Sequence, residues 1–235
     1  METLYYLILV PMVYLAVMVF VVGIIGRIVA LLRKPKFAPP LEIYPKKQPV
    51  WLWTIIDAFL LPTVFKHNRA LWTFLMIFHI CFLLTIIGHL ELITEMAWIQ
   101  VIGHDIFLGK GLVGLLMAIA LLYFLFRRFV SPTKELSAPE DYLLLILLFL
   151  TVIFGSEMDW ARRWYFYEEM EVESYRAYLS SLLLLRPEIG DVSPSGHSFM
   201  LVLHVFFANL FLMFFPFSSL MHAIFTIPLN KLRRG

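Results

Sequence analysis

Long apolar stretches constrain the fold of this chain more than any other feature. The first covers residues 4–32 and contains one charged residue, Arg27. A helix crosses a bilayer core with about 20 apolar residues, so this stretch can span a membrane. It is too long for the core of a signal peptide, and no small-residue cleavage site follows it. Hydrophobic residues make up 61% of the 235 residues and charged residues 15%, which predicts an integral membrane protein.

Four further stretches show the same pattern, so we expect an all-α membrane protein with five transmembrane helices in one domain, residues 1–235. The expected helices cover residues 4–32, 70–90, 106–126, 138–156 and 198–222. The apolar run of the fourth, residues 142–156, is short for a bilayer. Ser137 and Pro139 are typical of an N-cap and a first turn, which extends the expected helix to residue 138. Pro216 is expected to bend the fifth.

The distribution of charge predicts which ends of the helices face the cytoplasm. Residues 27–69, 127–141 and 231–235 hold 14 of the 19 Lys and Arg residues but 5 of the 17 Asp and Glu residues, a net charge of +9. The remaining flanks have a net charge of −7. Because cytoplasmic loops carry the excess of Lys and Arg, we expect the N-terminus outside and the C-terminus in the cytoplasm. The total net charge of +2 gives no reason to expect binding to nucleic acid.

Two connections are long enough to contain structure of their own. The inner loop, residues 33–69, includes an expected interfacial helix at 50–65 that would form a docking surface on the inner face. The outer loop, residues 157–196, is acidic and aromatic, and its residues 174–186 predict a short amphipathic helix over the outer face.

Histidines within the apolar stretches are the candidate functional residues. His79 and His89 lie in the second expected helix, His204 lies in the fifth, and His222 lies at its inner end. A polar side chain in hydrocarbon is costly and marks a site by default, although a lone histidine often makes only a hydrogen bond between helices. Because the two helices run in opposite directions, His79 is matched in depth with His222, and His89 with His204.

The spacings allow each helix to present two imidazoles. The 18 residues from His204 to His222 make about five turns, and the 10 residues from His79 to His89 leave that pair about 80° apart. In straight helices, however, His204 and His222 would be about 27 Å apart along the fifth helix, whereas His79 and His89 would be about 15 Å apart along the second. A bend at Pro216 together with helix tilt is needed to bring both pairs level.

Two opposed imidazoles fit axial ligation of haem iron better than a closed zinc site. We expect no cysteine or buried carboxylate near them. The absence of a CxxCH motif excludes covalent attachment of haem, and the single cysteine, Cys81, excludes an iron-sulfur cluster carried by this chain alone. Gly88 and the glycines at 103, 109, 111 and 114 would let a flat ring approach the backbone, or would serve helix packing equally well.

At these residues the sequence resembles the cytochrome b subunit of respiratory nitrate reductase, the gamma subunit. It is also similar to diheme subunits of complexes linked to sulfite reductase and heterodisulfide reductase. The resemblance spans residues 1–228 and is most specific in FHICFLLTIIGH at 78–89, RRFVSP at 127–132 and HVFFANLFLMFFPFSSLMH at 204–222.

The resemblance implies a multi-pass subunit of the plasma membrane that oxidises a quinol, expected to be menaquinol, near the outer face. It would pass electrons through two haems b, between the second and fifth helices, to a cytoplasmic iron-sulfur partner of a respiratory complex. By motif match, His89 and His204 would ligate the outer haem, and His79 and His222 the inner haem. Lys110 could contact the quinol, or could simply extend to the lipid headgroups.

Two other interpretations stay open at this point. Residues 194–197, PSGH, match a motif of the type 2 phosphatidic acid phosphatases, a class of membrane enzyme with a histidine nucleophile. Leu179 stands where that class has a lysine, and its later Ser-Arg and Asp are missing, so the phosphate would lack a cationic clamp. The second is a membrane anchor subunit without haem.

Overall fold

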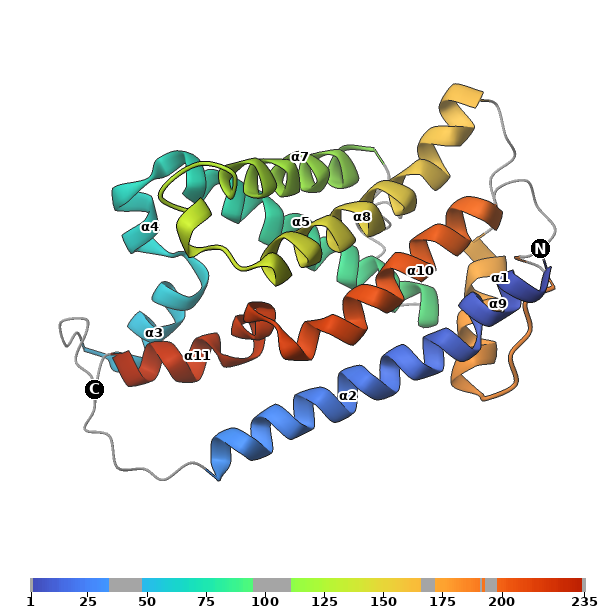
Figure 1. Ribbon diagram of the computed structural model, residues 1–235, viewed down its shortest axis with the longest axis horizontal. Helices are drawn as coiled ribbons and strands as arrows, with labels where there is room; N and C mark the ends of the chain where they lie inside the picture. The colour runs from blue at the N-terminus through green and yellow to red at the C-terminus, as the bar shows by residue number, and fades with distance from the viewer. Residues whose placement is uncertain are drawn as a thin grey trace.

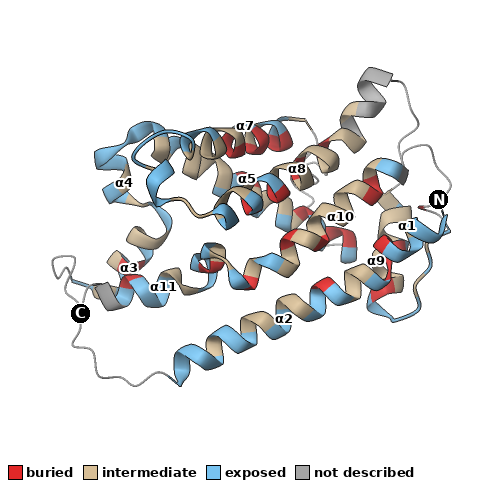
Figure 2. Cartoon of the chain, in the orientation of Figure 1, coloured by how far each residue is buried: buried red, intermediate tan, exposed pale blue. Residues whose placement is uncertain are grey.

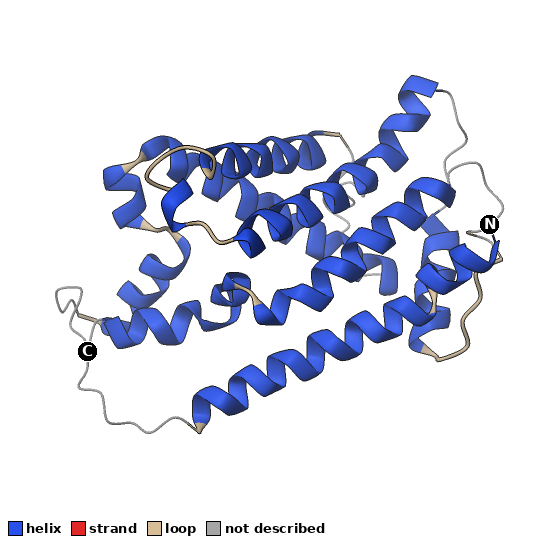
Figure 3. Ribbon diagram, in the orientation of Figure 1, coloured by secondary structure: helices blue, strands red, loops and turns tan. Residues whose placement is uncertain are grey.

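A computed structural model describes residues 2–33, 48–94, 111–165, 172–190, 192 and 198–233, and all regular structure in this part of the chain is helical (Figure 3). The α-helices are α1 (Glu2–Leu9), α2 (Pro11–Leu32), α3 (Val50–Phe59), α4 (Pro62–His67), α5 (Arg69–Ile93), α7 (Leu112–Arg127), α8 (Pro139–Tyr165), α9 (Val172–Leu183), α10 (Ser198–Phe214) and α11 (His222–Arg233). Three short 3-10 helices are η1 (Lys134–Leu136), η2 (Phe215–Phe217) and η3 (Ser219–Met221).

Four helical stretches are long and apolar enough to cross a bilayer: Glu2–Leu32, Arg69–Ile93, Pro139–Met158 and Phe199–Phe217. They correspond to the first, second, fourth and fifth expected helices, so the all-α class is confirmed and four of the expected helices are long and apolar enough to span a membrane. The third corresponds to α7, whose 16 described residues would extend about 24 Å. Residues 106–110 of that expected helix lie outside the described part of the chain. The count of five and the orientation therefore stay predictions.

The start of α8 agrees with its expected position, but its capping differs. The helix begins at Pro139, and Asp141 Oδ2 accepts a hydrogen bond from the backbone N–H of Ala138 at 3.0 Å. Ser137 is not the N-cap, because Ala138 directly precedes the helix and the Ser137 hydroxyl accepts from Arg128 and donates to the carbonyl of Thr133. At its other end α8 continues to Tyr165, so residues 157–165 are helical and do not begin the outer loop as expected.

The fifth expected helix is broken, as Pro216 predicts, and the break is larger than a bend. Helix α10 ends at Phe214, two 3-10 turns follow, and α11 begins at His222 (Figure 1). Proline has no backbone N–H and its ring collides with the preceding helical turn, which explains the end of the α-helical ladder here. The chain stays helical beyond the expected end at residue 222, in α11, which ends at Arg233.

The helices pack around a core at the junction of α5, α7, α8 and α10. Its buried members include Cys81, Met117, Leu121, Leu148 and Phe211, so Cys81 serves in packing. Figure 2 shows buried residues along α7, α8 and α10, whereas much of α2 is exposed. Exposed apolar side chains on an outer helix are expected where lipid is the solvent.

Helix α2 reaches the rest of the bundle mainly through α10 and the break. Phe20 packs against Phe215 with ring centroids 5.5 Å apart. The Arg27 Nε–H donates to the carbonyl of Pro216 at 3.1 Å. A Cβ atom added to Gly23 would lie 2.6 Å from Cβ of Pro216, so only glycine permits this approach. The break is therefore held from the side by α2.

Both long connections contain the expected helices, with changed bounds. In the inner loop two short helices replace the single expected one: α3 packs against α11 and α4 against α5. In the outer loop α9 ends at Leu183 and is fastened to the first span at two points. The Tyr178 hydroxyl donates to the carbonyl of Leu9 at 2.6 Å, and the Tyr14 hydroxyl donates to that of Leu182 at 2.9 Å. Burial, with a smaller effect from Tyr14, raises the pKa of Tyr178, which keeps its hydroxyl a donor.

The approach of α2 to Pro216 can be tested with paired glycine variants. We expect Gly23→Ala to lower the free energy of unfolding by about 1 to 3 kcal/mol, the usual cost of overpacking. Gly26 has open space where a Cβ would stand, so Gly26→Ala should leave stability unchanged or improve it through helix propensity. Thermal unfolding in detergent, followed by circular dichroism, measures both. Equal melting temperatures for the two variants would contradict the packing described here.

Candidate functional site

Five of the seven histidines lie in the described part of the chain: His67, His79, His89, His204 and His222. His79 and His89 lie on α5, His204 lies on α10, and His222 is the first residue of α11. His104, His197 and Lys110 lie outside the described residues, so the expected quinol contact of Lys110 stays a prediction.

The structure brings His89 and His204 together from α5 and α10. Their ring centroids are 6.0 Å apart and their planes differ by 24°. A metal–imidazole bond is about 2.0 to 2.1 Å and a nitrogen stands roughly 1.1 Å from its ring centre, so two rings bound on opposite sides of one metal have centres about 6.3 Å apart. The observed distance fits two axial ligands of a single metal ion.

In all four histidines of the apolar stretches, Nδ1 lies within hydrogen-bond distance of a backbone carbonyl oxygen. Nδ1 of His79 and of His89 lies 2.7 Å from the carbonyl oxygen one turn earlier, of Leu75 and Thr85 respectively. The corresponding distance from His222 to Ser219 is 3.2 Å. Because a carbonyl can only accept, the proton is on Nδ1, and Nε2 keeps the lone pair that binds a metal. His67 makes the same local contact with Thr63, so the contact fixes a tautomer but does not by itself identify a site.

His204 differs from the others because its Nδ1–H donates to a different helix. Its acceptor is the carbonyl of Thr151 on α8, at 2.8 Å. The ring reaches this carbonyl by lying over Gly155, where an added Cβ would stand 2.9 Å from Nδ1 and 3.0 Å from Cε1. A helix with a side chain at position 155 would exclude the ring. Helix α8 therefore determines the direction of the His204 ring.

Gly155, which lies directly against the His204 ring, is a residue of the candidate site that the sequence interpretation missed. Of the glycines expected near a flat ring, Gly88 and Gly114 are buried, Gly111 has open space around it, and those at 103 and 109 lie outside the described residues. A sequence signal for Gly155 exists in the pair Thr151 and Gly155, a hydroxyl residue and a glycine one turn apart in an otherwise apolar helix.

His79 and His222 are both exposed, and no ring contact joins them within the described part of the chain. The His79 ring packs edge-on against that of Phe78, with centroids 5.2 Å apart. His222 follows directly after the break in the fifth helix. An imidazole nitrogen exposed to hydrocarbon without a partner is costly, so both rings are candidates for a ligand contributed from outside the protein.

The chemistry available to the histidines is limited by their neighbours. No group of three or more His, Cys, Asp or Glu side chains placed to hold a metal occurs among the described residues. A protein zinc site needs three or four such ligands, so the His89–His204 pair alone does not form one. One carboxylate close in sequence to the histidines is buried: Glu91 is 3% exposed. It lies two residues after His89, about 200° around α5, on another face of the helix.

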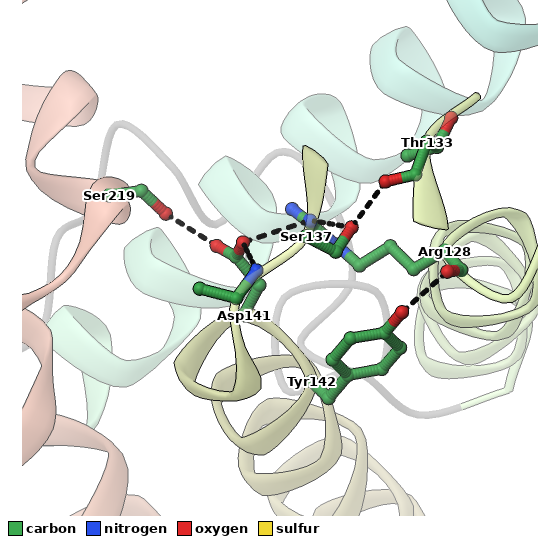
Figure 4. Close-up of polar contacts among 7 residues, drawn as sticks. Arg128, Thr133, Ser137, Asp141, Tyr142 and Ser219 are labelled. Carbon is green, nitrogen blue, oxygen red and sulfur yellow. Dashed lines mark hydrogen bonds and ion pairs between the residues drawn. The ribbon is translucent and has the colours of Figure 1, made fainter. Parts of the chain in front are cut away.

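A polar cluster connects the start of α8 with the break in the fifth helix (Figure 4). Arg128 and Asp141 form an ion pair at 3.1 Å, and Arg128 also donates to the hydroxyl of Ser137 at 2.9 Å. The hydroxyl of Ser219 donates to Asp141 Oδ1 at 2.9 Å. This cluster joins α7, α8 and η3 three residues before His222.

Comparison with known proteins identifies the family. Residues 62–235 match the sequence model of the family described as nitrate reductase gamma subunit. The chain belongs to this family. It is also 25% identical over 256 aligned residues to an Hdr-like menaquinol oxidoreductase cytochrome b-like subunit of Archaeoglobus fulgidus, covering 89% of this chain and 74% of the relative. A protein of the same name from Archaeoglobus profundus is 25% identical over 165 residues, which is 66% of this chain and 47% of the relative.

These matches support a cytochrome b-type membrane subunit of the nitrate reductase gamma family, as the resemblance in the sequence implied. The phosphatase alternative depends on residues 194–197, which lie outside the described part of the chain, and the family match runs through them. The matched region also contains all four histidines and Gly155.

Proposed function

We propose that this chain is a diheme cytochrome b subunit that oxidises menaquinol near the outer face of the plasma membrane and passes the electrons inward to a cytoplasmic iron-sulfur partner. His89 and His204 ligate the outer haem, and His79 and His222 ligate the inner haem. The observation that carries the proposal is the pair His89 and His204, whose ring spacing of 6.0 Å fits two ligands on one metal.

Haem fits these residues better than a bare metal ion. His89 and His204 would hold one haem iron through their Nε2 atoms, and His79 and His222 would hold the other. When bound, haem accepts and returns one electron at a time at its iron. The residues of the chain hold each imidazole as the Nδ1–H tautomer and keep its ring from turning, through Thr85 and Thr151 at the outer site.

The two proposed haem sites lie at different depths along the helices. His79 and His89 are 10 residues apart on one straight helix, a separation of about 15 Å. Their proposed partners are 18 residues apart, but the break at 215–221 lies between them. The chain does not follow a straight α-helix there, so the separation of about 27 Å calculated for 18 residues of straight helix is not the distance between His204 and His222.

Quinol oxidation releases two electrons and two protons. The side that we propose for it is the end of α5 that carries His89, because the flanks at that end have a net charge of −7 and so can accept protons. The basic flanks at the other end suit a soluble partner. Menaquinol is the proposed quinol because both curated relatives are named as subunits of a menaquinol oxidoreductase.

Haem content and single-histidine variants test the proposal together. Purified protein is expected to hold two non-covalent low-spin haems per chain. His89→Ala and His204→Ala should each remove one redox component, and His79→Ala and His222→Ala the other. Pyridine-haemochrome analysis and redox titration of the absorption spectrum measure both quantities.

The same measurements separate the competing functions. Protein without haem would favour the anchor interpretation, and crossed loss, such as one component shared by His79 and His204, would refute the proposed pairing. His67→Ala is the matched control, because His67 makes the same Nδ1 contact outside the spans and its removal should leave both components in place.

Gly155→Ala tests the orientation of the outer ligand. Its new methyl group would collide with the movable ring of His204, so the helix should remain folded while the ring leaves the Thr151 carbonyl. We expect an altered or lost low-spin signal for the component that His204→Ala removes, and an unchanged second component. Electron paramagnetic resonance distinguishes the two. Gly26→Ala, on the exposed face of α2, serves as control, and an unaltered spectrum in Gly155→Ala would refute the role of this glycine.

Reconstitution into vesicles tests the side of quinol oxidation. If electrons cross inward from an outer quinol, a membrane potential negative inside should slow reduction of the inner haem, since moving one charge across costs about 2.3 kcal/mol per 100 mV. Lys110→Ala should slow reduction by a menaquinol analogue. Stopped-flow absorption, with and without an imposed potential, follows both haems. If neither the membrane potential nor Lys110→Ala changes the rate of haem reduction, the quinol is not oxidised on the outer side.

A further inference from the structure

Ser219 makes two contacts of different kinds. Its hydroxyl donates to Asp141 Oδ1 at 2.9 Å, and its backbone carbonyl accepts the Nδ1–H of His222 at 3.2 Å. The residue is thus the physical connection between a carboxylate at the start of α8 and the imidazole at the start of α11. The carboxylate and the serine are 78 residues apart in sequence, so the tertiary fold creates this connection.

Asp141 is held firmly enough to position something else. Its side chain is 12% exposed, and that of Arg128, its ion-pair partner, is 27% exposed. Oδ2 accepts from both Arg128 and the backbone N–H of Ala138, which leaves Oδ1 for Ser219 (Figure 4). The charge of Asp141 is balanced by Arg128, so its contribution at Ser219 is a directed acceptor rather than an unpaired negative charge.

The segment that carries Ser219 needs such an external contact. Residues 215–221 form two 3-10 turns, whose hydrogen bonds have poorer geometry than those of an α-helix. Within the segment, the hydroxyl of Ser218 accepts from the backbone N–H of Leu220 at 3.1 Å. From outside, Arg27 holds the carbonyl of Pro216 and Asp141 holds Ser219. Of these two external contacts, the one from Asp141 is made by the same residue, Ser219, whose carbonyl accepts from His222.

We propose that Asp141 is a positioning residue for His222 and acts through Ser219. The inference rests on the proposed function, in which His222 ligates the inner haem. A hydrogen bond to Nδ1 fixes the plane of a metal-bound imidazole and raises its basicity. Asp141 therefore sets the orientation of the inner ligand, and with it the midpoint potential of the inner haem, without contacting the ligand itself.

Substitutions on either side of the Ser219–Asp141 bond test the inference. Ser219→Ala removes the donor, and Asp141→Ala removes the acceptor. Both variants should retain two haems per chain and shift the midpoint potential and low-spin resonance signal of the component that His222→Ala removes, with the other component unchanged. Ser219→Thr keeps a hydroxyl and should restore the wild-type values. Glu135→Gln is the control, because Glu135 belongs to the same connection between α7 and α8 but bonds to Ser131.

The outcomes separate this inference from the proposed function. Suppose that the wild-type protein holds two haems and that neither Ser219→Ala nor Asp141→Ala shifts the inner component. This result would overturn the inference and leave the proposed function standing. Equal shifts in both haem components, or a shift that Ser219→Thr does not reverse, would indicate general loosening of the bundle and would also overturn it. A wild-type protein without haem would overturn the proposed function and the inference with it.

Discussion

An imidazole placed in hydrocarbon must find partners for both of its nitrogens, and the arrangement of this bundle follows from that requirement. The backbone of an α-helix has few acceptors to spare, because its carbonyls are already bonded four residues along the chain. Each histidine of the apolar stretches nevertheless shares one carbonyl through Nδ1. Among the described residues, Nε2 is then the ring nitrogen without a hydrogen-bond partner, so a bond from Nε2 to a ligand would be strongly favourable.

The two proposed haem sites meet this requirement by different means. At the outer site, His204 uses a carbonyl of α8, a continuous helix of 27 residues, and Gly155 removes the side chain that would stand in the way. Close packing of two helices thus determines the ring direction. At the inner site, His222 uses Ser219 in a segment of 3-10 turns, and polar contacts replace packing. His204 is held by close packing over Gly155 together with a hydrogen bond to Thr151, whereas His222 is held by a hydrogen bond within the broken segment.

Much of this could be predicted from the sequence, because hydrocarbon allows few alternatives. Apolar length predicted the helical fold, Pro216 predicted an interruption of the fifth helix, and the opposite directions of the two helices predicted that His89 lies near His204. Gly155 was missed because the sequence does not tell which residues of the fourth helix face His204. The burial of Glu91 was missed because its place near a helix end suggests solvent, whereas α9 packs against α5 there. The Asp141–Ser219 contact joins residues too far apart for any local pattern to show.

The difference between the two sites has a consequence for how electrons leave the chain. A ligand held by shape can change only if two helices separate, which disturbs the whole core. A ligand held by hydrogen bonds at a broken helix can respond to smaller changes, because α11 packs against α3 of the inner loop, the region that we expect to meet the partner. In the proposed electron path, docking at α3 would therefore act on α11 and on His222 before it reached any other ligand. Under the proposed function, the ligand geometry of the inner haem would therefore be the one open to adjustment from the partner's side.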